Sequence, residues 1–230
     1  MLGGSLAILG KLDEAKIYLD KVIHSSNESA SIIQRITCYY FLSQISWFSG
    51  DGPGMIPHAL EMIKLCEAGD VRGFHGLALS TAGVGYFIQG EYKKAREYGE
   101  KGIAVQKEAG MNINTAWCYW FLSTILIDHP DALHRAEECA TEALNYAKGI
   151  GAKQLEAASY IMIGAIIGKA EPSRMDEALQ SIQLGISMFE NMKLLPSVAM
   201  GYLYLGELQA EYGMSEEARG SLLKAESLFR

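Results

Sequence analysis

Hydrophobic positions along the chain recur with the spacing of helices. Between positions 178 and 189, polar residues separate apolar side chains three or four positions apart, at Ala178, Leu179, Ile182, Ile186 and Phe189. This spacing places the apolar side chains on one face of a helix. Other stretches, such as 77–88, are strongly apolar, with small residues among aromatic ones. Apolar and polar residues never alternate over a sustained run, so the pattern predicts helices and no strands.

The pattern repeats about every forty residues. The segment 37–45 reads TCYYFLSQI and recurs eighty positions later, at 117–125, as WCYWFLSTI. An alanine inside a helical, partly acidic segment recurs at intervals of 36 to 44 residues, at Ala15, Ala59, Ala95, Ala136, Ala178 and Ala218. We therefore predict six repeats, each with an apolar stretch followed by an amphipathic one.

A turn signal separates the two stretches of each repeat: Gly10, Gly50 to Gly54, Gly90, 128–130, 171–173 and Gly213. Helical periodicity on both sides of a tight turn predicts an antiparallel helix pair. Acidic residues that begin second helices and Pro196 at the start of a first helix agree with this interpretation. Glycines that favour a left-handed cap are expected to end second helices, at Gly69, Gly110 and Gly149 or Gly151.

The third repeat carries a family resemblance. It reads Gly83-x-x-Tyr86-x-x-x-Gly90-x-Tyr92-x-x-Ala95, and the sixth repeat keeps Leu203, Gly206, Gly213 and Ala218 in matching spacing. This resembles the tetratricopeptide repeat (TPR), whose usual length is 34 residues. The longer repeats and the missing closing proline are more similar to the helix-pair repeats behind ATPase modules in bacterial regulators of the maltose-activator type, and in class III adenylate cyclases.

The resemblance implies an all-α fold, a right-handed α-α superhelix of about six antiparallel helix pairs that forms a single domain over 1–230. The chain opens inside a first helix and stops inside a second helix, at 227–230, without a polar helix to cover the last apolar face. We therefore expect residues 1–230 to be part of a longer protein, or a second copy to cover this end. A cyclase or ATPase module in the parent protein would supply its output.

Composition limits which partners and which cellular compartment we expect. The net charge is -7, and the clustered Lys and Arg that bind phosphate groups are lacking, so nucleic acid is not expected. The apolar N-terminal stretch has no basic lead and is too short to span a bilayer. We expect a cytoplasmic protein without a membrane segment. The cysteines are too far apart for a zinc or CxxC motif, and we expect reduced, buried thiols at Cys38, Cys66, Cys118 and Cys139.

The sequence carries no catalytic, metal or cofactor motif. The segment 164–170 lacks the spacing and the hydroxyl group of a phosphate loop, and no strand precedes Gly83-x-Gly85, so both are interpreted as helix-packing segments. The histidines form no HExxH motif. Cys38 and Cys118 occupy the same position of related repeats, which packing explains. The segment 27–29 matches a glycosylation sequon, which means little without secretion. We expect a noncatalytic protein without a cofactor.

In a solenoid of helix pairs, the first helices line a concave wall. The register places these candidate partner-binding residues on that wall: Tyr40, Gln44, Trp47, Ser80, Val84, Phe87, Trp120, Thr124, Tyr204, Glu207 and Glu211, with Ile127 and Met200 beside them. TPR clamps for a C-terminal carboxylate use Lys with Asn or Arg at such positions, and these candidates include none of the three. The resemblance therefore disfavours chaperone tails. An apolar or basic segment of a protein, such as a helix lying in the groove, is the expected partner.

The sequence thus predicts a noncatalytic protein-interaction and regulatory module of a bacterial signalling protein. A partner would stabilise one packing of the solenoid and so bias an attached domain. Two alternatives stay open. One is self-association of two copies, and the other, implied by the maltose-activator resemblance, is the sensing of a small molecule in a closed polar pocket. A hydrolase is a disfavoured third alternative.

Overall fold

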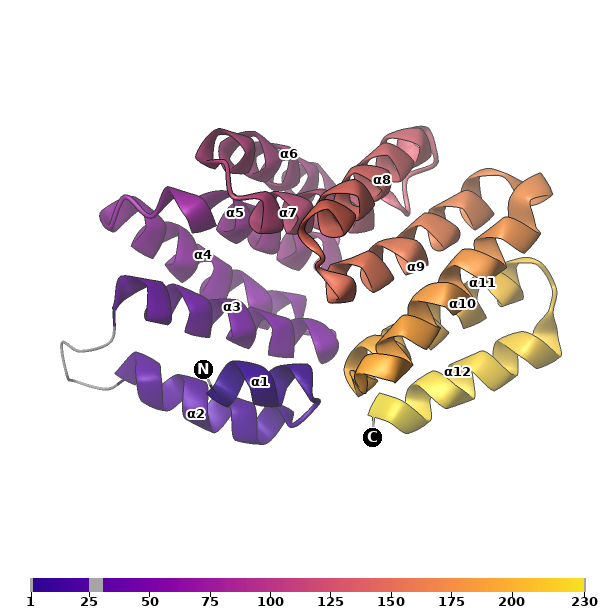
Figure 1. The fold of residues 1–230 in the computed structure, drawn as a ribbon, viewed down its shortest axis with the longest axis horizontal. Helices are drawn as coiled ribbons and strands as arrows, with labels where there is room; N and C mark the ends of the chain where they lie inside the picture. The colour runs from indigo at the N-terminus through magenta and orange to yellow at the C-terminus, as the bar shows by residue number, and fades with distance from the viewer. Residues whose placement is uncertain (1, 25–30, 230) are drawn as a thin grey trace. The chain divides into compact units, whose positions relative to one another are not determined.

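The computed structural model describes residues 2–24 and 31–229 (Figure 1). The sequon at 27–29 lies outside the described residues. Within them, the secondary structure is entirely helical, with two 3-10 helices, η1 (Pro130–Ala132) and η2 (Pro172–Arg174). The α-helices are α1 (Leu2–Ile8), α2 (Leu12–His24), α3 (Ile32–Phe48), α4 (Gly52–Ala68), α5 (Arg72–Ile88), α6 (Tyr92–Ala109), α7 (Asn112–Leu126), α8 (Leu133–Ile150), α9 (Lys153–Ala170), α10 (Met175–Met192), α11 (Leu195–Glu211) and α12 (Ser215–Phe229).

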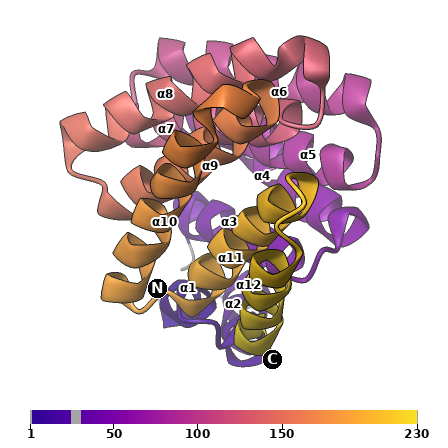
Figure 2. The same cartoon turned by 90° about the vertical axis from the view of Figure 1, so that its right-hand side faces the viewer.

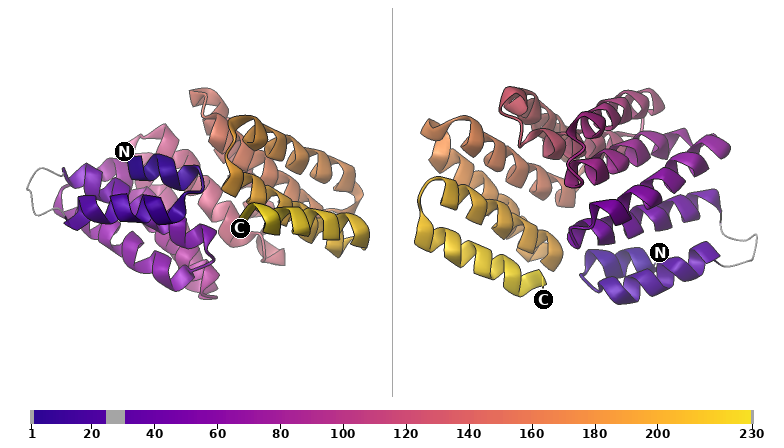
Figure 3. Two further views of the ribbon diagram at one scale, coloured as in Figure 1. Left: turned by 90° about the horizontal axis from the view of Figure 1, so that it is seen from below. Right: turned by 180° about the vertical axis from the view of Figure 1, so that it is seen from behind.

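The helices follow one another as six pairs, one for each predicted repeat, which confirms the all-α prediction. The chain divides into two compact units, Met1–Ile125 and Leu126–Arg230, here called unit 1 and unit 2. In unit 1, α1 packs on α2, α3 on α4 and α5 on α6 (Figure 3, right). In unit 2, α9 packs on α10 and α11 on α12 (Figure 2). The single domain over 1–230 stays a prediction.

First helices lie beside first helices within each unit. In unit 1, α3 contacts both α1 and α5, and in unit 2, α9 contacts α11. Four second helices also pack on the first helix that follows them: α2 on α3, α4 on α5, α8 on α9 and α10 on α11. Side chains about one repeat apart in sequence can therefore meet on neighbouring first helices. This stacking positions the candidate site.

Turns within the pairs form where the sequence predicts them. Four of the six use a glycine with positive φ, at Gly10, Gly50, Gly90 and Gly213, a conformation that costs glycine little because it lacks a Cβ. The other two use η1 and η2, each of which begins with a proline. The six predicted breaks are thus confirmed in position, but the one predicted over Gly50 to Gly54 is too long, because α4 already begins at Gly52 with Asp51 as its N-cap.

Caps at the ends of second helices agree only in part with the prediction. Gly110 and Gly151 adopt the left-handed conformation after α6 and α8, as expected. The prediction for Gly69 is wrong: its φ is -104°, and the left-handed residue is the next one, Asp70, with φ 47°. After α10 the left-handed cap is Lys193, with φ 58°, which sequence reasoning missed because residues other than glycine rarely adopt it.

Small residues set the spacing between paired helices. A Cβ added to Gly164 of α9 would lie 2.5 Å from the carbonyl oxygen of Ala178 on α10. A Cβ on Gly83 of α5 would lie 2.9 Å from the carbonyl oxygen of Ala95 on α6. Distances below 3.0 Å are not tolerated between such atoms, so glycine is required for this approach. The interpretation of 164–170 and Gly83-x-Gly85 as packing segments is confirmed.

A buried polar clamp holds the third repeat together. The side chain of Gln106 on α6 is 0% exposed. Its Nε2 donates to the carbonyl oxygen of Gly73 at 2.9 Å, and its Oε1 accepts from the backbone N–H of Leu77 at 3.2 Å. The Gly73 carbonyl also accepts a hydrogen bond from Asn114 Nδ2 on α7, at 2.6 Å. One carbonyl of α5 thereby connects three consecutive helices of unit 1.

Candidate functional site

Seven of the eleven predicted partner-binding residues keep part of their side chain exposed. They lie on three first helices: α3, α5 and α11. Spacings of three or four positions place those of α3 on one side of that helix and those of α11 on one side of theirs. The seven residues are Tyr40, Gln44, Trp47, Phe87, Tyr204, Glu207 and Glu211. Beside them, Met200 is half-buried.

The other four lie in the interior, which corrects the register argument. Ser80 and Val84 of α5 are 0% exposed, and Thr124 and Trp120 of α7 are 3% and 8% exposed. Ile127, the further candidate, is buried as well. Because α5 packs on α4 and α6 and also contacts α3, its predicted groove side is covered within unit 1. In this packing these side chains do not form a surface for a partner.

Aromatic rings join α3 to α7 inside unit 1. The ring centroid of Trp47 lies 5.2 Å from that of Trp120 and 5.7 Å from that of Phe121. Trp117 meets Trp120 edge to face at 5.7 Å, with an interplanar angle of 85°. Such pairs add about 0.5–1.5 kcal/mol each beyond the burial of their area. Trp120 thus serves packing, whereas the half-buried Trp47 also presents part of its ring outward.

Tyr40, Gln44 and Trp47 form what we call the α3 surface. All three are half-buried. Burial, and to a lesser degree the nearby Cys118, raises the pKa of Tyr40, so its hydroxyl stays protonated at neutral pH. Gln44 Nε2 is shielded from solvent and has no hydrogen-bond partner in the described part of the chain. The α3 surface therefore offers two rings and an amide with unused hydrogen-bonding capacity.

Three carboxylates and one ammonium group lie close together on and beside α11 in unit 2. Lys169 Nζ, at the end of α9, donates to Asp128 Oδ1 at 2.7 Å and lies 3.9 Å from Glu211 Oε1 on α11. Glu207 lies one turn before Glu211, and among the described residues it has no ion-pair partner within 4.0 Å. Tyr204 lies one turn earlier still. We call Tyr204, Glu207, Glu211, Asp128 and Lys169 the α11 surface.

The α11 surface carries more negative than positive charge. Burial raises the pKa of Glu207; the charge of Lys169 opposes this, and those of Asp128 and Glu211 add to it. Burial likewise raises the pKa of Tyr204, and the charges of Glu207 and Asp128 raise it further. Partial burial lowers the pKa of Lys169, but the hydrogen bond and charge of Asp128 outweigh it, so the net direction is upward. A further cation would be attracted here.

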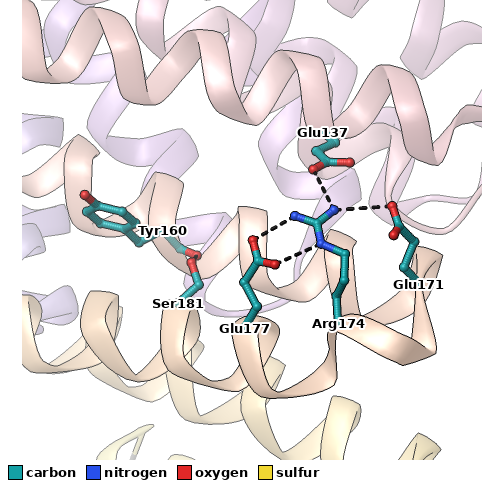
Figure 4. A network of polar contacts seen from close by, with 6 residues as sticks. All are labelled: Glu137, Tyr160, Glu171, Arg174, Glu177 and Ser181. Atoms are coloured by element: carbon teal, nitrogen blue, oxygen red, sulfur yellow. Dashed lines mark hydrogen bonds and ion pairs between the residues drawn. The ribbon is translucent and has the colours of Figure 1, made fainter.

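A second acidic cluster of unit 2 has a structural role (Figure 4). Arg174 donates to both carboxylate oxygens of Glu177, at 2.9 and 2.7 Å, and also to Glu171 at 3.3 Å and Glu137 at 3.4 Å. The bidentate geometry holds the Glu177 carboxylate in place, and the single bond to Glu137 joins η2 and the start of α10 to α8. Nearby, Ser181 of α10 donates to the carbonyl oxygen of Tyr160 on α9, at 2.7 Å. The cluster therefore joins helices.

Sequence reasoning missed Asp128 and Lys169 as members of the α11 surface. Asp128 was expected in a turn, and Lys169 at the end of a packing segment. Their separation carried the signal: the two are 41 positions apart, about one repeat length, and Glu211 follows Lys169 after a similar interval. In a solenoid, residues one repeat apart occupy equivalent places on adjacent pairs.

Candidate metal ligands and nucleophiles were sought among the described residues. No group of three or more His, Cys, Asp or Glu side chains among residues 2–24 and 31–229 could hold a metal ion. All four cysteines are buried thiols outside any disulfide. Burial raises the pKa of Cys118 to about 12, so this thiol is protonated at neutral pH and carries little of the thiolate that acts as a nucleophile. None of the described helices has the length and hydropathy to cross a bilayer.

Comparison with known proteins connects this chain to solved structures. No protein-family model matches the sequence, and no curated protein matches it either. The structure of apo RapI matches with a TM-score of 0.75 at 12% identity, over 97% of this chain and 78% of RapI. Aspartyl phosphate phosphatase F from Bacillus subtilis matches with a TM-score of 0.74 at 16% identity, over 99% of this chain and 57% of that protein.

A third structure has a lower score. It is a signal-transduction ATPase with numerous domains and a tetratricopeptide repeat sensor, from Pyrococcus horikoshii, which matches with a TM-score of 0.56 at 16% identity. The match covers 99% of this chain but only 35% of that protein. Identities this low show the fold alone. The fold of this chain is that of a TPR-type repeat protein, as the resemblance implied.

Proposed function

We propose that this chain is a noncatalytic protein-interaction module that holds a basic segment of a partner protein on the α11 surface. The observation that carries the proposal is the charge balance there: Asp128, Glu207 and Glu211 share one counter-charge, Lys169. A partner's Lys or Arg beside Glu207 would supply the missing cation and lower the cost of ionising that carboxyl group. The adjacent Tyr204 ring could pack along the stem of such a side chain.

The α3 surface would bind an apolar part of a partner. Trp47 and Tyr40 offer amphipathic rings of the kind that dominates protein interfaces. The continuous groove expected from the sequence stays a prediction. So does the regulatory step, in which the bound partner stabilises one packing of the repeats and biases an attached domain.

Peptide binding tests the proposal. The probe is a helix-forming peptide rich in Lys and Arg, measured by isothermal titration calorimetry against the same peptide with Gln at every basic position. We expect the basic peptide alone to bind, with an affinity that falls as salt is added. The double variant Glu207→Gln/Glu211→Gln should lose at least tenfold in affinity, or about 1.4 kcal/mol.

The control is Glu216→Gln/Glu217→Gln at the start of α12, which changes the net charge of the same unit equally outside the α11 surface. If both double variants weaken peptide binding equally, the effect comes from net charge alone, and this would contradict a local site. Binding of the Gln peptide as tightly as the basic peptide would contradict the charge argument itself.

Trp47 tests the α3 surface separately. Trp47→Ala should weaken the binding of a partner with an apolar helix. Trp120→Ala reports the packing role of the same aromatic cluster and should cost about 3–5 kcal/mol of stability. If Trp47→Ala lowers stability as much as Trp120→Ala and leaves binding unchanged, the α3 surface is only part of the core.

A further inference from the structure

A polar cavity of about 440 Å³ lies in unit 1 and shares no residue with the α3 surface. Three helix ends meet around it: the end of α4, the start of α5 and the end of α6. Its volume falls within the roughly 300–1,000 Å³ typical of small-ligand sites. The lining residues are Cys66, Glu67, Asp70, Arg72, His75, Val105, Glu108 and Ala109. The proposed function makes no use of this cavity.

Acidic groups outnumber basic ones in the wall of the cavity. Arg72 Nε donates to Asp70 Oδ1 at 3.0 Å, so the one permanent cation is paired within the wall. This leaves the carboxylates of Glu67 and Glu108, which come from different helices and have no Lys or Arg partner among the described residues. The cavity therefore holds about two uncompensated negative charges when His75 is neutral.

Backbone dipoles favour the same sign of ligand. Helices α4 and α6 both end at the cavity, and the C-terminal end of a helix dipole carries partial negative charge. The start of α5 contributes the opposite sign, and its cap, Val71, has no side chain that could satisfy the first amides. Two helix ends thus oppose one, which leaves a net preference for a cation.

His75 supplies an unused hydrogen-bonding atom in the wall. Its Nε2 is shielded from solvent and has no hydrogen-bond partner in the described part of the chain. The nearest carboxylate oxygen, Glu67 Oε1, is 3.7 Å away, beyond hydrogen-bond distance. Buried polar atoms nearly always have a partner. A ligand nitrogen with several hydrogens could donate to the carboxylate and, in the matching tautomer, to the ring.

One side of the cavity is apolar. Val105 and Ala109 lie one turn apart on α6, and Cys66 faces them from α4. Burial raises the pKa of Cys66 to about 12, and the charge of Glu67 adds to this, so the thiol is neutral and adds no charge. An apolar wall beside carboxylates suits a ligand with a hydrocarbon stem and a charged head.

We propose that this cavity binds an organic cation, an amine or guanidinium group on a short aliphatic stem. Glu67 and Glu108 balance its charge, His75 and Glu67 accept its hydrogens, and Val105 and Ala109 pack against its stem. The head group comes either from a free small molecule or from the Lys or Arg side chain of a protein. The chemistry is the same for both sources.

Calorimetry with the full chain distinguishes the two sources. The probes are agmatine, as a free guanidinium compound, and a short peptide with blocked ends whose only charged side chain is one arginine. Binding of agmatine alone indicates a free cation, and binding of the peptide indicates a protein side chain. Inorganic phosphate is the control probe, because it carries the opposite charge. If neither cation binds, or if phosphate binds in their place, the proposal is wrong.

Matched variants locate the site. Glu67→Gln/Glu108→Gln should weaken the cation at least tenfold, and His75→Phe should weaken it without any change in net charge. The control Glu61→Gln/Glu97→Gln changes the same charge on the same two helices, α4 and α6, outside the cavity. Equal loss in this control would overturn the local site. Because Glu207→Gln/Glu211→Gln leaves the cavity intact, it should bind agmatine normally, which separates failure here from failure of the proposed function.

Discussion

Replacement of Gly164 by alanine tests the close packing of α9 on α10. The new Cβ would lie 2.5 Å from the Ala178 carbonyl oxygen, 2.8 Å from Ile182 Cγ1 and 3.0 Å from the Ile182 backbone nitrogen. Two of these atoms are backbone, so α10 itself must move away. Overpacking of this kind costs about 1–3 kcal/mol, and alanine regains up to about 1 kcal/mol through its helix propensity. We expect a net loss of about 1–2 kcal/mol.

Gly220 provides the matched control. It lies in α12 of the same unit, and a Cβ added there would meet nothing within 4 Å. Gly220→Ala should therefore stabilise the chain by about 0.5–1 kcal/mol. The difference between the two variants removes helix propensity and isolates the packing cost. Urea denaturation followed by far-ultraviolet circular dichroism measures both, and equal stability of the two variants would refute the close approach of α9 and α10.

Three further predictions follow from buried or ionisable side chains. Gln106→Leu should cost about 1–3 kcal/mol in urea denaturation, because it removes the two hydrogen bonds that this buried side chain makes to Leu77 and Gly73; wild-type stability would contradict the clamp. Burial raises the pKa of Glu207, so ionising it opposes folding above its folded-state pKa and has no cost below its unfolded-state pKa. Glu207→Gln should thus raise the urea midpoint at neutral pH, and this gain should vanish as the pH is lowered; a gain independent of pH would contradict the cause. The thiols of Cys66 and Cys118, each with a pKa of about 12, should resist a thiol reagent until urea unfolds the chain, and rapid labelling of the native protein would show that they are not buried.

The repeat pattern was enough to predict the helices and their turns. Alanines about forty residues apart and turn signals between apolar and amphipathic stretches depend on local chemistry, which a sequence displays directly. The left-handed caps at Asp70 and Lys193 were missed because that conformation is unfavourable for these residues in isolation.

The candidate site was predicted in part. The i, i+3 or i+4 register identified Tyr204, Glu207 and Glu211, and the structure places them on one side of α11. The same register failed for Ser80 and Val84, because it cannot tell how many neighbours cover a helix, and α5 is covered on several sides. No sequence pattern indicated the cavity around His75, since its wall comes from three helix ends that meet only after folding.

The carbonyl of Gly73 has a consequence for how this chain could evolve. Because it accepts hydrogen bonds from both Gln106 and Asn114, the third repeat is tied to its successor by polar groups particular to it. Deletion or duplication of a forty-residue segment across this point would leave buried hydrogen-bond donors without an acceptor, even where the hydrophobic surfaces still matched. The repeats are thus not interchangeable parts, and we expect the lineage to have changed here by point substitution, with gain or loss of whole modules confined to other junctions.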